Sequence, residues 1–210
     1  MIVTPLILPL LGWGAAILLG GIGIASAAGF FKDPDKNKLG VLGMQQAGKT
    51  RFLSFLRGVP FIEGQTSRSG YDDFVYTLSN GKKIYIKAGV DIGGGEIYKV
   101  DYNRIINESD VLLYFFDIDK YLNDNNLGYR RDCNSRFEHI YDKAKEAKAP
   151  VVVIATHRDK CSYGDSVMKQ KFDSLVQNKG YKKMLNEVQY VNLTNNSDMK
   201  KLADKIFKGE

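Results

Sequence analysis

Short apolar runs alternate with amphipathic stretches from residue 38 to the end of the chain. Apolar runs of this length are typical of buried strands, and apolar residues at helical spacing are typical of amphipathic helices. The expected strands are Leu39–Leu42, Tyr71–Leu78, Lys83–Val90, Val111–Phe116, Pro150–Ala155 and Glu187–Leu193. The expected helices are Lys49–Arg57, Arg130–Lys148, Asp165–Asn178 and Asp198–Phe207. This alternation predicts an α/β fold with a six-stranded, mainly parallel sheet flanked by helices.

Two connections refine the predicted sheet. Asn80-Gly81 separates the second and third strands and is a strong hairpin turn signal, so these two strands are expected to be antiparallel. The segment Asp117–Gly128 is polar and is expected to be a loop. Residues 38–210 therefore make one domain of ordinary size.

The first part of the chain differs, because residues 2–31 are apolar and contain no charged residue. At ~1.5 Å per helical residue, the run is long enough to cross a ~30 Å hydrocarbon layer. The favoured interpretation is one transmembrane helix, with an anchor at 1–31, a juxtamembrane linker at 32–37 and the folded domain at 38–210. A signal peptide cleaved near Ala25–Ala27 and a buried core helix are the alternatives.

Charge and small-residue spacing extend the membrane interpretation. Lys32, Lys36 and Lys38 follow the apolar run, so the positive-inside rule places the domain in the cytosol. Glycine or alanine recurs every four residues along the run, a spacing that lets helices approach closely in lipid and predicts self-association. The general abundance of glycine in membrane helices is the alternative explanation. The small residues concerned are Gly12, Ala16, Gly20, Gly21, Ala25 and Gly29.

Composition narrows the function only slightly. The formal net charge is +6, but the lysines alternate with apolar residues, so solvated helix faces are expected. Attraction to an anionic membrane leaflet is a second interpretation, and no sequence motif indicates nucleic acid binding. Cys133 and Cys161 match no pairing rule, which fits a reducing compartment.

The strongest chemical signal is Gly43–Thr50, which reads G-x-x-x-x-G-K-T, the phosphate-cradling loop of P-loop nucleoside triphosphatases. Backbone N–H groups of such a loop wrap a phosphate, Lys49 can reach the β- and γ-phosphates, and Thr50 offers a hydroxyl to Mg²⁺. A glycine-rich turn with an incidental lysine is the alternative. The residues expected to hold the phosphates are Gly43, Gln46, Ala47, Gly48, Lys49, Thr50 and Arg51.

Two downstream segments are placed to complete a metal and phosphate site. Asp91–Gly94 follows the third predicted strand as D-x-x-G, so Asp91 is expected to reach Mg²⁺ through water and the Gly94 N–H to meet the γ-phosphate. Thr66 lies between the loop helix and the second strand, and its hydroxyl and carbonyl are expected to join the metal site. Ser67 and Ser69 are close rivals for that role.

Two other strand ends are candidates for base recognition. Asp159 follows a buried strand within Thr156-His157-Arg158-Asp159. Its carboxylate can accept hydrogen bonds from the N1–H and exocyclic amine of guanine, which adenine cannot supply. Leu193 lies at the end of the last strand, where backbone N–H groups usually meet the base carbonyl oxygen. The expected ligand is therefore GTP or GDP with Mg²⁺.

Taken together, these motifs resemble a small GTPase of the Ras-like superfamily. Asp91–Gly94 reads D-I-G-G and is similar to the D-V-G-G of Arf-like GTPases. A membrane helix before such a domain resembles the β-subunit of the signal-recognition-particle receptor. The resemblance implies a P-loop GTPase fold, a change of state between GTP and GDP, and a protein effector that the sequence does not identify.

The chain departs from the Ras-like pattern at two places. Ras-like and Arf-like enzymes have a water-orienting Gln directly after D-x-x-G, where this chain has Gly95. Their guanine motif has a Lys that packs on the base, where this chain has His157. Thr156–Asp159 is closer to the T-x-R-D of guanylate-binding proteins, which implies that Arg158 lies next to the base.

Gln45 offers a replacement for the missing Gln. The loop resembles the G-x-Q-S-A-G-K-S of dynamin-like GTPases, in which the loop Gln helps to position water. This resemblance makes Gln45 a candidate catalytic residue, together with Lys49 of the phosphate loop and Gly94 of D-x-x-G. The alternative is that Gln45 only obstructs the γ-phosphate and that hydrolysis is slow.

These features lead to the hypothesis of a membrane-anchored GTP-binding switch. It would span the membrane once, face the cytosol with its G domain and hydrolyse GTP slowly, controlling a membrane-associated partner. The alternatives are a non-hydrolysing nucleotide-binding receptor or scaffold, and a membrane-assembling effector triggered by its G domain.

Overall fold

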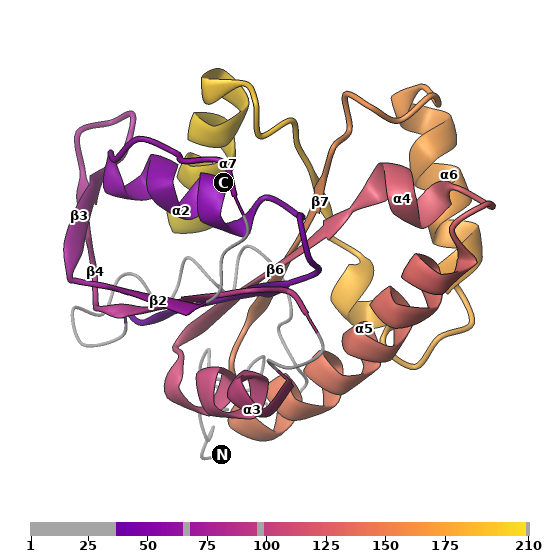
Figure 1. Ribbon diagram of the computed structural model, residues 1–210, viewed down its shortest axis with the longest axis horizontal. Coiled ribbons are helices and arrows are strands. Elements are labelled where there is room, and N and C mark those ends of the chain that lie inside the picture. Colours follow the sequence, from indigo (N-terminus) through magenta and orange to yellow (C-terminus); the bar gives the residue numbers. More distant parts are fainter. Residues whose placement is uncertain (1–36, 65–67, 96–98, 209–210) are drawn as a thin grey trace, which may run out of the picture.

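A computed structural model describes residues 37–64, 68–95 and 99–208 of the chain (Figure 1). The predicted membrane anchor at 1–31 and residues 32–36 of its linker lie outside these residues, so the anchor and the linker stay predictions. Within the described part, no helix is long and apolar enough to cross a membrane.

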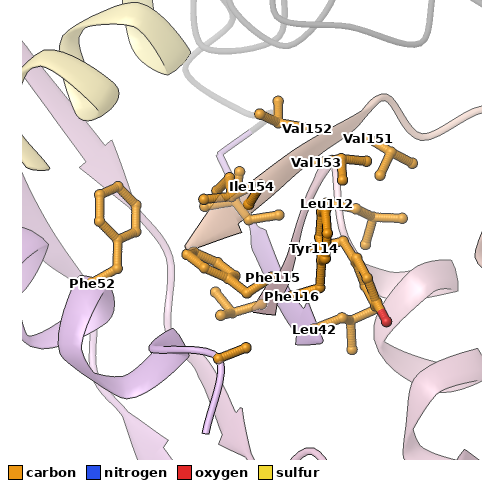
Figure 2. Close-up of a cluster of buried hydrophobic side chains, with 14 of the residues drawn as sticks. Leu42, Phe52, Leu112, Tyr114, Phe115, Phe116, Val151, Val152, Val153 and Ile154 are labelled. Carbon is orange, nitrogen blue, oxygen red and sulfur yellow. The ribbon is translucent and has the colours of Figure 1, made fainter. Parts of the chain in front are cut away.

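A four-stranded parallel sheet forms the centre of the fold. Its strands are β1 (Leu39–Gly43), β6 (Val111–Asp117), β7 (Val151–Thr156) and β8 (Gln189–Tyr190), in the order β1-β6-β7-β8. Both faces of β6 and β7 are buried, which explains why their sequences read as continuous apolar runs. Figure 2 shows aromatic and branched side chains of these strands packed together in the core, with Phe52 beside them.

Helices cover both faces of this sheet (Figure 1). On one side, α2 (Lys49–Arg57) packs against α7 (Asn196–Lys208). On the other side, α3 (Lys99–Glu108) packs against α5 (Leu127–Ala147), and α4 (Ile118–Leu122) lies against α5 and α6 (Asp165–Val176). The predicted α/β fold with a parallel sheet flanked by helices is therefore confirmed.

The predicted antiparallel hairpin is present, but each of its arms is divided into two strands. β2 (Arg68–Tyr71) pairs with β5 (Gly89–Ile92), and β3 (Phe74–Thr77) pairs with β4 (Lys83–Ile86). The two ladders continue one register, and the break lies where the Ala88 N–H donates to the Asp73 carboxylate (2.5 Å). A side chain there takes the place of a backbone acceptor and interrupts the ladder.

The expectation of one six-stranded sheet is therefore wrong in detail. Four strands form the parallel sheet, and the hairpin forms two separate two-stranded ladders. β5 nevertheless lies beside β1, and a backbone hydrogen bond joins Lys87 N to Asn37 O (3.2 Å). The end of β5, with Asp91, is thereby carried to the same edge of the fold as the end of β1.

Three helical segments were not predicted. α3 presents Tyr102, Ile105 and Ile106 to the core at helical spacing. α4 lies within the segment Asp117–Gly128, which was expected to be a loop. A helix begins there because the Asp117 carboxylate caps its first turn by accepting from Lys120 N (3.0 Å). A short 3₁₀ helix, η3 (Lys182–Leu185), precedes β8.

Candidate functional site

A cleft of about 760 Å³ opens at the carboxyl ends of β1, β6 and β7. In open α/β sheets this edge is where ligands bind, and the volume lies within the range of small-molecule sites. Four of the segments selected from the sequence meet there: the loop Gln45–Arg51, the D-x-x-G segment, Thr156–Asp159 and Asn192–Thr194. The lining residues include Gln45, Gln46, Ala47, Gly48, Lys49, Thr50, Arg51, Gly93, Gly94, Gly95, Thr156, Asp159 and Leu193.

The phosphate loop is shaped by glycines that no other residue could replace without strain. Gly43 leaves β1 at φ 143°, and a Cβ there would overlap the backbone of Phe115 in β6. Gly48 has φ 84°, and a Cβ there would overlap the side chain of Leu193. Met44 N donates to Phe115 O (2.9 Å), which fixes the start of the loop on the sheet. The backbone can therefore turn tightly at both ends of the loop.

Lys49 is buried at the centre of this loop, with 5% of its surface exposed. Its ammonium donates to Met44 O (2.7 Å) and Gly43 O (3.3 Å). Burial lowers the pKa of Lys49 to about 8, while the Asp91 carboxylate acts in the opposite direction. A buried ammonium within a loop of this sequence pattern is suited to contact a phosphate group.

Asp91 lies opposite Lys49 at the end of β5, also 5% exposed. Burial raises its pKa, and a hydrogen bond from the Thr50 side chain opposes this effect. Among the described residues, Oδ1 of Asp91 has no hydrogen-bond partner although it is buried. An orphaned carboxylate oxygen beside a threonine hydroxyl fits the oxygen ligands that Mg²⁺ prefers. The third predicted metal residue, Thr66, lies outside the described residues.

The D-x-x-G segment lies directly on the phosphate loop. A Cβ at Gly94 would overlap the backbone of Met44 and Gln45, so only glycine allows this approach. Gln45 is exposed and lines the cleft together with Gly94 and Lys49. The three candidate catalytic residues are thus brought together by the fold.

At the other end of the cleft, Asp159 lines the wall next to Thr156, whose hydroxyl donates to Phe116 O (3.1 Å). His157 has φ 59°, and its Nδ1 lies 3.3 Å from Oδ2 of Asp117. Burial lowers the pKa of His157, and the Asp117 carboxylate opposes this effect. The imidazole is therefore held against the end of β6 rather than free in solvent.

Arg158 points elsewhere. Its guanidinium forms two hydrogen bonds to the Asp165 carboxylate at the start of α6 (2.8 and 2.6 Å). It does not line the cleft in the part of the chain that the structure describes. The Arg158 guanidinium therefore pairs with Asp165 and does not line the cleft with Asp159, although the resemblance to guanylate-binding proteins implied a place next to the base.

The side chain of Leu193, and not only its backbone, contributes to the cleft. It is buried over Gly48 and so joins the base side of the cleft to the phosphate loop. The Asn192 carboxamide oxygen accepts from both N and Oγ1 of Thr194 (2.8 and 2.7 Å), which holds this turn in shape.

Several residues of the cleft lining were not selected from the sequence, and three of them make informative contacts or follow a strand. Phe61 lines the cleft with its ring 4.4 Å from the Arg51 guanidinium, and no local pattern marks it. Asp117 follows the apolar strand β6, so the strand-end argument used for Asp159 could have found it. Lys120 donates to the Gln46 side chain (3.2 Å), a contact across 74 positions that no motif reveals.

Comparison with known proteins gives one distant similarity. No protein-family model matches the chain. Over 119 residues, 57% of its length, the chain is 27% identical to ADP-ribosylation factor-like protein 10 of Mus musculus. The match spans 44% of the length of that relative. Together with the phosphate loop and the parallel sheet, this similarity suggests a small GTPase of the Ras/Arf superfamily.

Proposed function

We propose that this protein is a guanine-nucleotide-binding switch that holds GTP or GDP with Mg²⁺ in the cleft described above. The observation that carries the proposal is the buried Lys49 ammonium, ringed by the phosphate-loop backbone. A buried cation is costly unless anions compensate it. Asp91 offsets part of this cost, and we infer that the phosphate groups of a ligand offset the rest.

The base assignment rests on Asp159. Its carboxylate offers only acceptors to the cleft, which complements the N1–H and exocyclic amine of guanine. Phe61 supplies an aromatic surface on the cleft wall, and Leu193 lies between the base end and the phosphate loop. Guanine is therefore proposed over adenine.

Mg²⁺ is proposed to be held by the Thr50 hydroxyl and, through water, by Asp91. The fit rests on the partnerless buried oxygen of Asp91 and on the Thr50 hydrogen bond. When bound, the ion would neutralise phosphate charge. The chain's own contribution is to orient the two oxygen donors and to keep Lys49 beside them.

The direct test is the nucleotide that the protein carries. The full-length chain, purified in mild detergent, is expected to release GDP or GTP on denaturation, identified and quantified by ion-exchange chromatography. Recovery of ATP or ADP, or equal competition by ATP for the loaded nucleotide, would contradict the guanine proposal.

Hydrolysis is proposed to be slow and to depend on Gln45. Gly95 has no side chain to orient water, whereas the exposed Gln45 amide lines the cleft next to Gly94. Turnover is expected at or below the ~10⁻⁴ s⁻¹ of an unassisted Ras-like enzyme. If Gln45 does not contribute, the missing side chain at Gly95 favours the second candidate function, a nucleotide-binding receptor that does not hydrolyse GTP.

Gln45→Ala separates these two functions. If Gln45 orients the attacking water, single-turnover hydrolysis should fall about tenfold or more, or ~1.4 kcal/mol in barrier, with little change in affinity. Gln170→Ala, an exposed change on α6, is the matched control. An unchanged or faster Gln45→Ala would mean that Gln45 obstructs, and the receptor function would be the better account.

Membrane anchoring is proposed from the sequence alone, through the uncharged residues 2–31 and the lysines that follow. The cytosolic side is also the side that holds GTP, which agrees with the positive-inside rule. A membrane-associated protein partner and self-association through the glycine-patterned run are part of the same proposal.

Protease protection tests the orientation. In sealed right-side-out vesicles, added protease should spare the folded domain, and detergent should then expose it to cleavage. Cleavage of the domain in intact vesicles, or its release as a soluble product processed after Ala27, would contradict the anchor.

A further inference from the structure

A buried chain of polar groups runs beneath the phosphate loop. Arg136 of α5 donates from Nη1 to the Tyr102 hydroxyl (2.7 Å), and this hydroxyl donates to Gly43 O (2.9 Å). Arg136 is 6% exposed and Tyr102 is 2% exposed. Three elements distant in sequence, namely α5, α3 and the start of the loop, are thus joined away from water.

Each hydrogen bond in this series of polar groups has a defined donor and acceptor. The guanidinium can only donate, so the hydroxyl accepts from Arg136 and directs its own proton to Gly43 O. A hydroxyl that accepts from a cation is a stronger donor, and both bonds are reinforced by the low dielectric around them. Gly43 O also accepts from the Lys49 ammonium (3.3 Å), so the chain ends on a carbonyl shared with the candidate phosphate-binding cation.

The place of Tyr102 in the sequence matters as well. It lies in α3, the first helix after the D-x-x-G segment, whose Gly94 touches the loop at Met44 and Gln45. The first turn of the loop is therefore fixed on one side by Phe115 of β6 and on another by Tyr102 of α3. A displacement of α3 would be transmitted to the loop through this bond.

We propose that Tyr102 is a positioning residue that fixes the phosphate loop to α3, so that nucleotide retention depends on its hydroxyl. This rests on the proposed function, because it assumes that the loop binds phosphates. Tyr102 acts through Gly43 and Lys49 and does not itself touch the nucleotide.

Tyr102→Phe tests the proposal in the full-length protein, because it removes one oxygen and keeps the ring. Dissociation of a fluorescent GDP analogue is expected to become about five- to tenfold faster, the effect of losing one buried hydrogen bond. In ³¹P NMR of bound GDP, the β-phosphate resonance should shift more than the α-phosphate resonance. A purely structural role would not produce this difference.

Tyr114→Phe is the matched control. Tyr114 of β6 is equally buried, and its hydroxyl has no hydrogen-bond partner among the described residues, so its removal should leave GDP dissociation unchanged. If Tyr102→Phe fails to fold, Arg136→Lys should accelerate dissociation in the same direction, because it keeps the charge but loses the planar donor geometry.

The outcomes separate this inference from the proposed function. A wild-type rate in Tyr102→Phe, or equal acceleration in both tyrosine variants, would overturn the positioning role and leave nucleotide binding intact. Failure of the wild-type protein to bind any guanine nucleotide would overturn the proposed function and this inference with it.

Discussion

Replacing Lys49 with methionine is expected to lower the affinity for GDP and GTP by at least about a hundredfold, that is, to abolish binding at ordinary concentrations. The ammonium is the buried cation of the cleft, and charge-assisted hydrogen bonds contribute ~1.5–3 kcal/mol each. Methionine keeps the length of the side chain, so the loss measures charge and donors rather than packing. Titration calorimetry with the full-length protein gives the affinity directly.

The same variant should not lose stability in the nucleotide-free state. Folding lowers the pKa of Lys49 from 10.5 to about 8, so the folded protein binds this proton less tightly than the unfolded chain does. The wild type should therefore gain stability as the pH rises from about 8 to 10, and Lys49→Met should lack that gain.

The control for Lys49→Met is Lys143→Met. Lys143 lies on the solvent side of α5 and pairs only with the exposed Glu146 in the described part of the chain, so neither binding nor the pH profile should change. A Lys49→Met protein that still binds GDP with wild-type affinity would remove the central argument for a phosphate site.

Local patterns predicted the elements whose sequences carry their own signal. α2 has the predicted bounds, because the loop glycines set its start and Gly58 ends it in the left-handed conformation. β6 and β7 were predicted within one residue at each end, since buried parallel strands read as continuous apolar runs. The Asn80-Gly81 turn correctly predicted the hairpin and the antiparallel direction of its strands.

Errors arose where a side chain far away in sequence, or a single capping residue, decided the local structure. The hairpin arms are divided because Asp73 replaces a backbone acceptor for Ala88. The expected loop after β6 begins as a helix, because Asp117 caps it and because Ile118 and Tyr121 are buried in the core. Neither effect is visible in the hydrophobic pattern of the segment itself.

The residues of the candidate site also divide into those that local sequence patterns predicted and those that only the fold reveals. Gly43, Gly48, Lys49 and Asp91 could be found because phosphate and metal binding demand those residue types at fixed spacing. The contact of Tyr102 with Gly43 spans 59 positions and could not be found without the fold. Arg158 was selected by resemblance, but its guanidinium pairs with Asp165, seven residues later.

Asp159→Asn is expected to change the base that the cleft accepts. The carboxylate offers acceptors alone, whereas the asparagine amide offers both a donor and an acceptor. The asparagine NH₂ group would then face the N1–H or the amine of guanine, and two donors cannot form a hydrogen bond. At least one hydrogen bond from guanine to a charged carboxylate would therefore be lost. Affinity for GDP should fall about a hundredfold, at ~1.5–3 kcal/mol for each such bond.

Xanthine carries a carbonyl oxygen where guanine carries the amine, so the amide donor that Asp159→Asn introduces complements xanthine. Affinity for XDP should therefore rise in this variant while affinity for GDP falls, which a general loss of structure could not produce. Asp165→Asn is the matched control, because its carboxylate pairs with Arg158 outside the cleft lining. Competition of XDP, GDP and ADP against one fluorescent nucleotide measures all three affinities. If Asp159→Asn lowers the affinity for every base equally, Asp159 supports the cleft without reading the base, and the guanine assignment loses its chemical basis.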